Sequence, residues 1–480
     1  MYQFQSVKNY HEALARKQVT CELIVKHYLE KIEESKTLNA FVEIFKKEAL
    51  QKAKELDEKR SKNLSLGKLH GVVISIKDVI CYKDHHVTAG SKMLKDFRSV
   101  YSATVIEKLL SEDAIIIGVC NCDEFAMGST NETSVYGPVR NAMDNNRVSG
   151  GSSGGSAVSV QAELCMLSLG SDTGGSVRQP ADYCGIVGYK PSYGMISRYG
   201  LIAYASSFDQ IGIFAKNTND ILTVLDVIKG SDEYDSTMST QEETLTTKIK
   251  VSTHRIALLK NALEHSSLDS EIKKSIILLS DKLKGEDCIV DEKNFDLIDY
   301  IVPAYYILTT AEASSNLSRY DGIRYGHRAT DKNLTIDMFY KKNRSEGFGI
   351  EVKKRIMLGS FVLSEGYFDA YFTKAQKVRQ MLVEQTMRIF EEYDFIMLPT
   401  VTSTAGILGQ MKNDAIAMYL SDIYTVFANL TGLPAISLPL FKHSNGLPFG
   451  VQLVGKKNSD RQLLEFSNYI LEHFNTNADV

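Results

Sequence analysis

Two short runs of glycine and serine constrain this chain more than any other feature of its sequence. The runs span residues 150–156 and 170–176, with a helix-like stretch (157–163) and then an apolar, strand-like stretch (164–169) between them. Glycine lets a backbone bend tightly and leaves its N–H groups uncovered. A single run of this kind is usually a linker or a turn. Two runs at the ends of one helix–strand unit instead predict two walls of a single site.

Ser176 closes the second run, and its neighbours predict a junction between a strand and a helix. The helix signal after it has Pro180 early in the first turn and Gly185 at the position of a C-cap. Uncovered N–H groups beside a hydroxyl are the arrangement that acyl transfer requires, because the tetrahedral intermediate carries an oxyanion. We therefore interpret Ser176 as a nucleophile.

The rest of the chain alternates between strand-like and helix-like stretches, which is typical of a layered α/β fold. Its 480 residues allow two or three domains. Residues 231–350 differ in character, because a polar, turn-rich stretch is followed by a strand-like stretch at 256–259 and then by several helical ones. We interpret this region, with approximate bounds, as a helical insertion or subdomain on the main body.

Composition argues against several classes of function. The formal net charge is −4 and the pI is about 6.2, whereas nucleic-acid binders tend to be basic. The overall charge does not exclude a local basic patch. No apolar stretch approaches about 20 residues, so we expect no membrane span, and the first residues lack the features of a secretory signal. The seven cysteines are scattered and odd in number, which favours reduced thiols in the cytoplasm. We expect no metal site, because no His, Cys and carboxylate spacing indicates one.

A lysine lies inside one strand-like stretch, at residues 69–80. The stretch is apolar except for Ser75 and the pair Lys77-Asp78, which suits a strand buried on both faces. Lysine is rarely buried without a partner or a function. Two interpretations stay open: a lysine at the strand end that reaches water, or a desolvated neutral amine that acts as a general base.

Two kinds of serine catalysis fit the glycine runs to different degrees. The first run matches Gly-x-Ser-x-Gly in two registers, around Ser152 and around Ser153. A nucleophile elbow, however, follows an apolar strand, and residues 144–149 do not form a strand-like stretch. The later histidines also lack an aspartate motif to pair with. A Ser-Ser-Lys arrangement of Ser176, Ser152 and Lys77 needs no histidine, provided that the lysine pKa is lowered. The glycines are not a nucleotide phosphate loop, because the pattern Gly-x-x-x-x-Gly-Lys is absent.

The two runs, together with Lys77-Asp78, resemble the amidase signature family of amide hydrolases. This resemblance implies an α/β amidase-signature fold that spans residues 1–480 as one domain, with a mixed central β-sheet, helices on both faces and the helical insertion. Within the family, the chain is similar to the glutaminase subunits of tRNA-dependent amidotransferases. The stretches that carry the resemblance include residues 123–129, 181–185, 188–191, 206–212, 312–324, 345–349 and 429–434.

The resemblance implies a role for each part of the predicted site. Ser176 would form the acyl-enzyme, and Ser152, which a cis peptide typically precedes in this family, would relay the proton to Lys77. The oxyanion hole would consist of the backbone N–H groups of Thr173, Gly174, Gly175 and Ser176.

Three further residues fall where the family binds glutamine. A guanidinium can bind the α-carboxylate of glutamine through two parallel hydrogen bonds, and a carboxylate can form an ion pair with the α-ammonium. The residues concerned are Tyr306, Arg355 and Asp422.

The resemblance also implies partners. Ammonia from glutamine would convert misacylated Glu-tRNA(Gln) to Gln-tRNA(Gln), in a heterotrimer with B and C subunits, of which C is small. We expect no cofactor in this chain, because ATP and Mg²⁺ would be bound by a partner, which would also make most contacts with the tRNA. Two alternatives stay open: a stand-alone amidase of the same family that acts on small amides, and a non-catalytic scaffold subunit.

Overall fold

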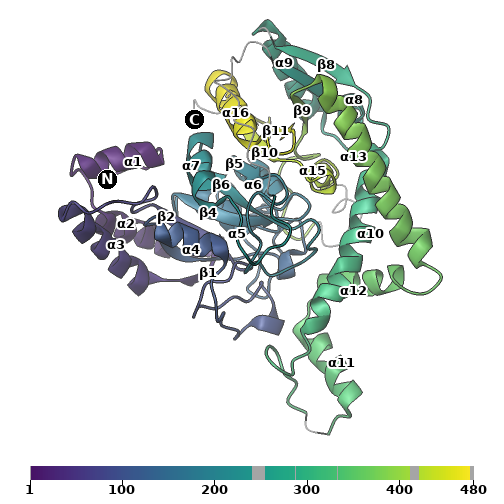
Figure 1. Ribbon diagram of the computed structural model, residues 1–480, viewed down its shortest axis with the longest axis horizontal. Coiled ribbons are helices and arrows are strands. Elements are labelled where there is room, and N and C mark those ends of the chain that lie inside the picture. The colour runs from purple at the N-terminus through teal and green to yellow at the C-terminus, as the bar shows by residue number, and fades with distance from the viewer. Residues whose placement is uncertain (1, 240–253, 287, 332, 411–420, 476–480) are drawn as a thin grey trace.

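The computed structural model describes residues 2–239, 254–286, 288–331, 333–410 and 421–475. Within this part of the chain, eleven strands form one sheet in the order β1-β3-β2-β4-β6-β5-β10-β11-β9-β7-β8 (Figure 1). Strand β2 is parallel to β3 and β4, and β7 is parallel to β8 and β9, whereas the other neighbouring strands are antiparallel. The strands are β1 (Phe41–Ile44), β2 (Val73–Lys77), β3 (Ile115–Cys120), β4 (Leu167–Asp172), β5 (Val187–Lys190), β6 (Gln210–Ala215), β7 (Arg255–Leu259), β8 (Ile289–Lys293), β9 (Phe395–Pro399), β10 (Ala435–Lys442) and β11 (Pro448–Gly455).

Helices pack along this sheet, and a group of long helices lies at one side of the molecule, on the right in Figure 1. That group comprises α10, α11, α12 and α13, and a π-helical turn at Asp369–Thr373 leads into α13. The helices are α1 (Val7–Ala15), α2 (Cys21–Glu34), α3 (Lys46–Ser61), α4 (Thr104–Ser111), α5 (Gly154–Gln161), α6 (Arg178–Cys184), α7 (Thr218–Ile228), α8 (Lys260–Leu263), α9 (Ser270–Gly285), α10 (Ile298–Asn316), α11 (Ile336–Gly347), α12 (Ile350–Val362), α13 (Lys374–Glu392), α15 (Val426–Thr431) and α16 (Asp460–Phe474).

Local signals in the sequence account for several of these boundaries. Thr20 caps α2 by accepting a hydrogen bond from the N–H group of Leu23 at 3.1 Å. Gly185 ends α6 with a φ of 65°, a left-handed conformation that suits glycine. Helix α15 begins at Val426, so Asp422 lies in the turn before it.

The centre of the sheet is fully buried, as the apolar sequence of its strands predicts. Every residue of β2, β3 and β4 is buried, which is the usual state of parallel strands covered on both faces. Strand β2 is shorter than the predicted stretch and ends at Lys77. The predicted α/β class with a mixed central sheet is therefore confirmed.

The stretch 231–350 contains both sheet and helix. Strands β7 and β8 come from this stretch and extend the sheet beyond β9. Helices α10 and α11 also belong to it. The bounds of a helical insertion, and the single domain over residues 1–480, stay predictions.

Candidate active site

The second glycine run forms a loop between β4 and α6. Strand β4 ends at Asp172 and α6 begins at Arg178, so Ser176 lies on the loop between them with 8% of its surface exposed. Gly175 has a φ of 123°, which residues with a side chain rarely adopt. A Cβ atom at this position would also lie 2.1 Å from Thr425 Oγ1. The loop conformation therefore requires glycine here.

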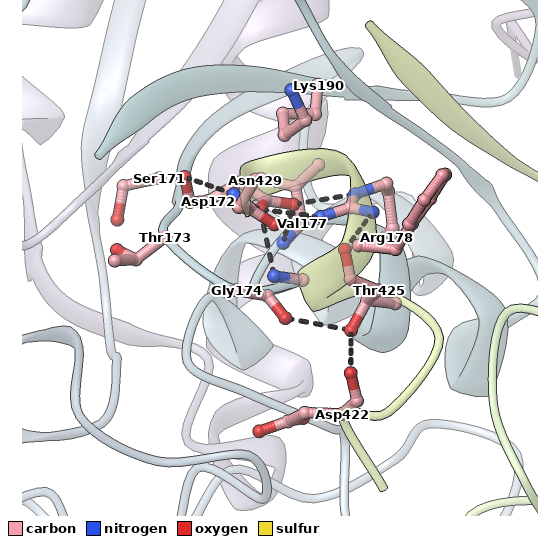
Figure 2. A network of polar contacts seen from close by, with 12 residues as sticks. Ser171, Asp172, Thr173, Gly174, Val177, Arg178, Lys190, Asp422, Thr425 and Asn429 are labelled. Carbon is pink, nitrogen blue, oxygen red and sulfur yellow. Dashed lines mark hydrogen bonds and ion pairs between the residues drawn. The ribbon is translucent and has the colours of Figure 1, made fainter. Parts of the chain in front are cut away.

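A fully buried ion pair stabilises this loop (Figure 2). Arg178 donates from Nη2 to Asp172 Oδ1 at 2.9 Å and from Nε to Oδ2 at 3.1 Å. Asn429 donates from Nδ2 to the same Oδ1 at 2.9 Å. Burial raises the pKa of Asp172, but the charge of Arg178 and these hydrogen bonds outweigh that effect and lower the pKa to about 2. The carboxylate is therefore ionised at neutral pH.

The same carboxylate determines which amides of the loop are available to a ligand. Asp172 accepts hydrogen bonds from the N–H groups of Gly175 and Val177, at 2.8 and 3.2 Å. The loop N–H groups that have no acceptor in the described part of the chain are those of Thr173, Gly174 and Ser176. Of the four amides predicted to form an oxyanion hole, three are therefore available, and the N–H group of Gly175 is occupied.

Lys77 lies at the end of β2, and none of its surface is exposed. Its Nζ atom donates to Ser152 Oγ at 2.7 Å and to Ser171 Oγ at 2.9 Å. Burial lowers the pKa of Lys77 to about 8, although nearby acidic groups partly oppose this shift. Of the two interpretations of this lysine, the one in which its amine reaches water is wrong.

The structure brings the two glycine runs together, as the sequence predicts. The N–H group of Ser153 donates to the backbone carbonyl of Ser176 at 3.2 Å. The peptide bond between Gly151 and Ser152 is cis. A Cβ atom on Gly151 would lie 2.1 Å from Asp123 Oδ2, so only glycine fits between the first run and that carboxylate. The predicted residues Lys77, Ser152 and Ser176 thus belong to one buried region.

The three residues predicted to bind glutamine also lie together. Tyr306 comes from α10, Arg355 from α12 and Asp422 from the turn before α15. Tyr306 donates from its hydroxyl to Asp422 Oδ2 at 3.2 Å. The guanidinium of Arg355 lies 5.3 Å from the centroid of the Tyr306 ring, within the range of a cation–π contact. A buried cation and a buried carboxylate therefore flank one tyrosine.

Thr425 joins this group to the loop between β4 and α6 that contains Ser176. Its hydroxyl lies 2.8 Å from the carbonyl oxygen of Gly174 and 3.1 Å from that of Asp422 (Figure 2). The two ends of the candidate site, which are about 250 residues apart in sequence, are thus bridged by one side chain. This arrangement suits a small substrate with an amide at one end and charged groups at the other.

Comparison with known proteins assigns the chain to a family. A family model described as Amidase matches residues 23–464. The chain belongs to the amidase family. Amidase relatives from Chlorobaculum parvum and Staphylococcus carnosus, both described as the A subunit of glutamyl-tRNA(Gln) amidotransferase, are 45% and 44% identical to it; the matches cover 94% and 98% of this chain and the same shares of the relatives.

Solved structures of amidases agree with this assignment. A crystal structure of the glutamyl-tRNA(Gln) amidotransferase A subunit from Thermotoga maritima is 36% identical, with a TM-score of 0.78, and the match covers 94% of this chain and 92% of that one. Another crystal structure, described as an amidase, is 25% identical with a TM-score of 0.82. The family and the fold predicted from the glycine runs are confirmed.

Three residues in this amidase site were not predicted from the sequence: Ser129, Tyr204 and Glu351. Ser129 donates to Asp422 Oδ2 at 2.8 Å, and Arg355 donates to the hydroxyl of Tyr204 and to Glu351 Oε1, both at 2.8 Å. Glu351 precedes Arg355 by four residues on α12, and this i,i+4 spacing is a signal that could have found it. Ser129 and Tyr204 lie 293 and 151 residues from their partners, so no local pattern points to them.

Two further observations concern the described residues alone. No group of three or more His, Cys, Asp or Glu side chains in them is arranged to hold a metal ion. Among the helices of the described ranges, none has both the length and the apolar character needed to cross a membrane.

Proposed function

We propose that this amidase is the glutaminase component of a tRNA-dependent amidotransferase and that it hydrolyses the side-chain amide of glutamine through Ser176. The observation that carries the proposal is the buried amine of Lys77, which lies 2.7 Å from Ser152 Oγ and 2.9 Å from Ser171 Oγ, near the end of the strand that leads into the loop of Ser176. The relatives described as the A subunit of glutamyl-tRNA(Gln) amidotransferase, which match this chain over nearly its whole length, support this assignment.

The chemistry follows from the order of the three side chains. Ser176 Oγ attacks the amide carbon, and its proton passes through the hydroxyl of Ser152 to the neutral Nζ of Lys77. The oxyanion that forms accepts hydrogen bonds from the available amides of the loop. The proton then returns by the same route to the leaving nitrogen, so ammonia departs and a γ-glutamyl ester remains on Ser176. Water, deprotonated by the same relay, hydrolyses the ester and releases glutamate.

The charged residues at the other end of the site suit the α-groups of glutamine. Arg355 uses Nε and Nη1 for Glu351 and Tyr204, which leaves Nη2 to bind the α-carboxylate. Asp422 would face the α-ammonium. Burial raises the pKa of Asp422 to about 6, an effect that Ser129 and Arg355 partly oppose, and a bound ammonium would lower that pKa again.

We also propose that the ammonia is used on a partner. The description of these relatives as an A subunit supports an assembly with further subunits. We propose that these are B and C subunits and that a partner binds ATP, Mg²⁺ and most of the misacylated tRNA. The acidic pI of this chain agrees with that division. We place the complex in the cytoplasm, which suits the seven free and buried cysteines.

One face of the molecule suits contact with such a partner. Large apolar side chains are exposed along one side of α12 and on the turn that follows it, where the rings of Phe361, Tyr367 and Tyr371 contact one another, whereas monomers rarely expose a contiguous apolar patch. We call this set the α12 face; it consists of Ile350, Met357, Leu358, Phe361, Tyr367, Phe368 and Tyr371.

Ammonia release from glutamine tests the proposal, with and without co-expressed B and C subunits. Ser176→Ala should abolish both ammonia release and the γ-glutamyl adduct seen by intact-protein mass spectrometry. The complex should still amidate Glu-tRNA(Gln) with added ammonium, because that step belongs to the partner. Ser318→Ala changes an exposed serine outside the site and serves as the control.

Three results would overturn the proposal. Normal ammonia release by Ser176→Ala would exclude the mechanism. A chain that is fully active on simple amides and indifferent to the partners would identify it as a stand-alone amidase. A chain that assembles with them but never forms the adduct would identify it as a scaffold subunit.

A further inference from the structure

Two stretches that carry the family resemblance without a catalytic role, 123–129 and 345–349, contact each other. The buried carboxylate of Glu124 accepts the N–H group of Gly349 at both oxygens, at 2.8 and 3.1 Å. Ser91 Oγ donates to Glu124 Oε1 at 2.5 Å and also lies 3.3 Å from the carbonyl oxygen of Gly347. Gly349 is the N-cap of α12, so Glu124 binds the start of the helix that bears Arg355.

Glu124 and Gly349 are closely packed, and so are the residues that follow and precede them, Phe125 and Phe348. A Cβ atom on Gly349 would lie 2.3 Å from Glu124 Oε2, although the φ of −70° would allow a side chain there. The adjacent rings of Phe125 and Phe348 pack edge to face, with centroids 5.5 Å apart. A carboxylate is favourable at a helix N-terminus, because the helix dipole is positive there. The contact therefore fixes where α12 begins relative to the loop.

Burial of the Glu124 carboxylate is also unfavourable in free energy, because the charged group loses its contacts with water. In the described part of the chain, no lysine, arginine or histidine lies within ion-pair distance of this carboxylate, so hydrogen bonds from Ser91 and Gly349 supply most of the compensation for desolvation. Burial raises the pKa of Glu124 to about 7, even though Ser91, Gly349 and the more distant charge of Lys353 oppose the shift. Buried acids whose pKa is strongly shifted by desolvation are common at functional sites.

The same loop contacts the two other parts of the candidate site. The N–H group of Asp123 donates to the carbonyl oxygen of Ser152 at 3.1 Å. Ser129 donates to Asp422 Oδ2 at 2.8 Å. The stretch 123–129 thus contacts Ser152 and Asp422. Through Glu124 it also contacts the start of α12, the helix that bears Arg355.

We propose that Glu124 is a positioning residue, which fixes the N-terminus of α12 so that Arg355 faces the α-carboxylate of glutamine opposite Asp422. The identity of the substrate rests on the proposed function. Because Glu124 acts through α12, its loss should weaken the binding of glutamine and leave the acyl-transfer chemistry at Ser176 intact.

Steady-state kinetics of Glu124→Gln in the complex with B and C subunits test this role. The amide keeps one oxygen for Gly349 but places an NH₂ group against a backbone N–H donor. We expect the KM for glutamine to rise about tenfold or more and kcat to change less than about threefold. Hydrolysis of 4-aminobutyramide, which lacks the α-carboxylate, should stay near the parental rate, and this also shows that the variant is folded.

Four further variants make the test specific. Glu132→Gln is the matched control, because Glu132 is a buried carboxylate that accepts the N–H group of another glycine, Gly409, at 2.8 Å and does not contact α12. Gly349→Ala should raise the KM as Glu124→Gln does, because its Cβ displaces the carboxylate. The double variant Gly349→Ala with Glu124→Ala should be no worse than Glu124→Ala alone, because the clash is removed.

The outcomes separate this proposal from the proposed function. Equal losses on glutamine and on 4-aminobutyramide, or a KM for Glu124→Gln no higher than that for Glu132→Gln, would overturn the positioning role. A parental complex that does not hydrolyse glutamine, or an Arg355→Ala variant with an unchanged KM, would instead overturn the assignment of the substrate site.

Discussion

Lys77 is fully buried, so its surroundings determine its protonation state. Burial lowers its pKa to about 8, against the partial opposition of nearby acidic groups. Only the neutral amine accepts a proton from Ser152, and its fraction rises with pH. We expect kcat/KM for glutamine to rise about tenfold per pH unit below about pH 7 and to level off above about pH 8. A pH–rate profile of the complex measures this, and a profile that falls between these values would contradict the role of Lys77 as a base.

Asp172 and Arg178 form an ion pair whose members are both fully buried. Removing one member leaves an uncompensated buried charge, which destabilises proteins by about 3–5 kcal/mol. We expect Arg178→Ala to lower the free energy of unfolding by that amount and to abolish ammonia release, because Asp172 also holds the loop of Ser176.

Urea unfolding measures this effect, and a partly exposed pair supplies the control. Arg147 and Asp144 lie 3.3 Å apart with partly exposed side chains. Such pairs contribute about 0–1 kcal/mol, so Arg147→Ala should cause a small change. Similar losses in Arg147→Ala and Arg178→Ala would show that burial does not determine the contribution of this pair.

At the scale of elements, the loop between β4 and α6 depends on a glycine. An alanine at Gly175 would be strained at a φ of 123°, and its Cβ would clash with Thr425. We expect Gly175→Ala to lower the free energy of unfolding by about 3 kcal/mol and to reduce ammonia release at least tenfold. The control is Gly446→Ala, which also has a positive φ, of 85°, but has no atom within 4 Å of its Cβ and should lose about 1 kcal/mol. Equal losses of unfolding free energy in Gly175→Ala and Gly446→Ala would show that the contact with Thr425 is unimportant.

The sequence predicts elements that depend on local signals, including the strand at 256–259 that corresponds to β7, but it does not predict which strands pair across the fold. The strand, loop and helix around Ser176 follow from a glycine run and a C-cap, which short stretches specify. That β7 and β8 extend the sheet depends on pairing with β9, more than 100 residues later, which no local pattern reveals. Likewise Tyr204 and Ser129 were missed because their partners are distant in sequence. The catalytic and binding roles themselves stay predictions.

At the scale of the whole molecule, the described part of the chain contains an arrangement suited to releasing ammonia, but no group of metal-binding side chains that could support the activation of a carboxylate with ATP. An amidotransferase must therefore bring in a second chain, and the α12 face is the surface that we expect it to cover. Helix α12 lies on the opposite side of the molecule from α3 in Figure 1. The α12 face lies partly on α12, the same helix that bears Arg355, so contact with a partner there could bias the proposed glutamine site.

Met357→Glu with Phe361→Glu tests this surface, because both side chains are exposed on α12, Met357 by 72%. Charges there should reduce assembly with the B and C subunits at least tenfold, since desolvating a carboxylate in an apolar interface is unfavourable. The isolated variant should keep its parental melting temperature, because neither side chain is buried. Leu64→Glu, at a side chain that is 55% exposed just beyond α3, should leave assembly unchanged. Size-exclusion chromatography measures assembly, and ammonia release is measured on the same fractions. Thermal unfolding of the isolated variant measures the melting temperature. If the double variant still assembles, and ATP with Glu-tRNA(Gln) still raises its glutamine turnover as in the parental complex, the partner binds elsewhere on the chain.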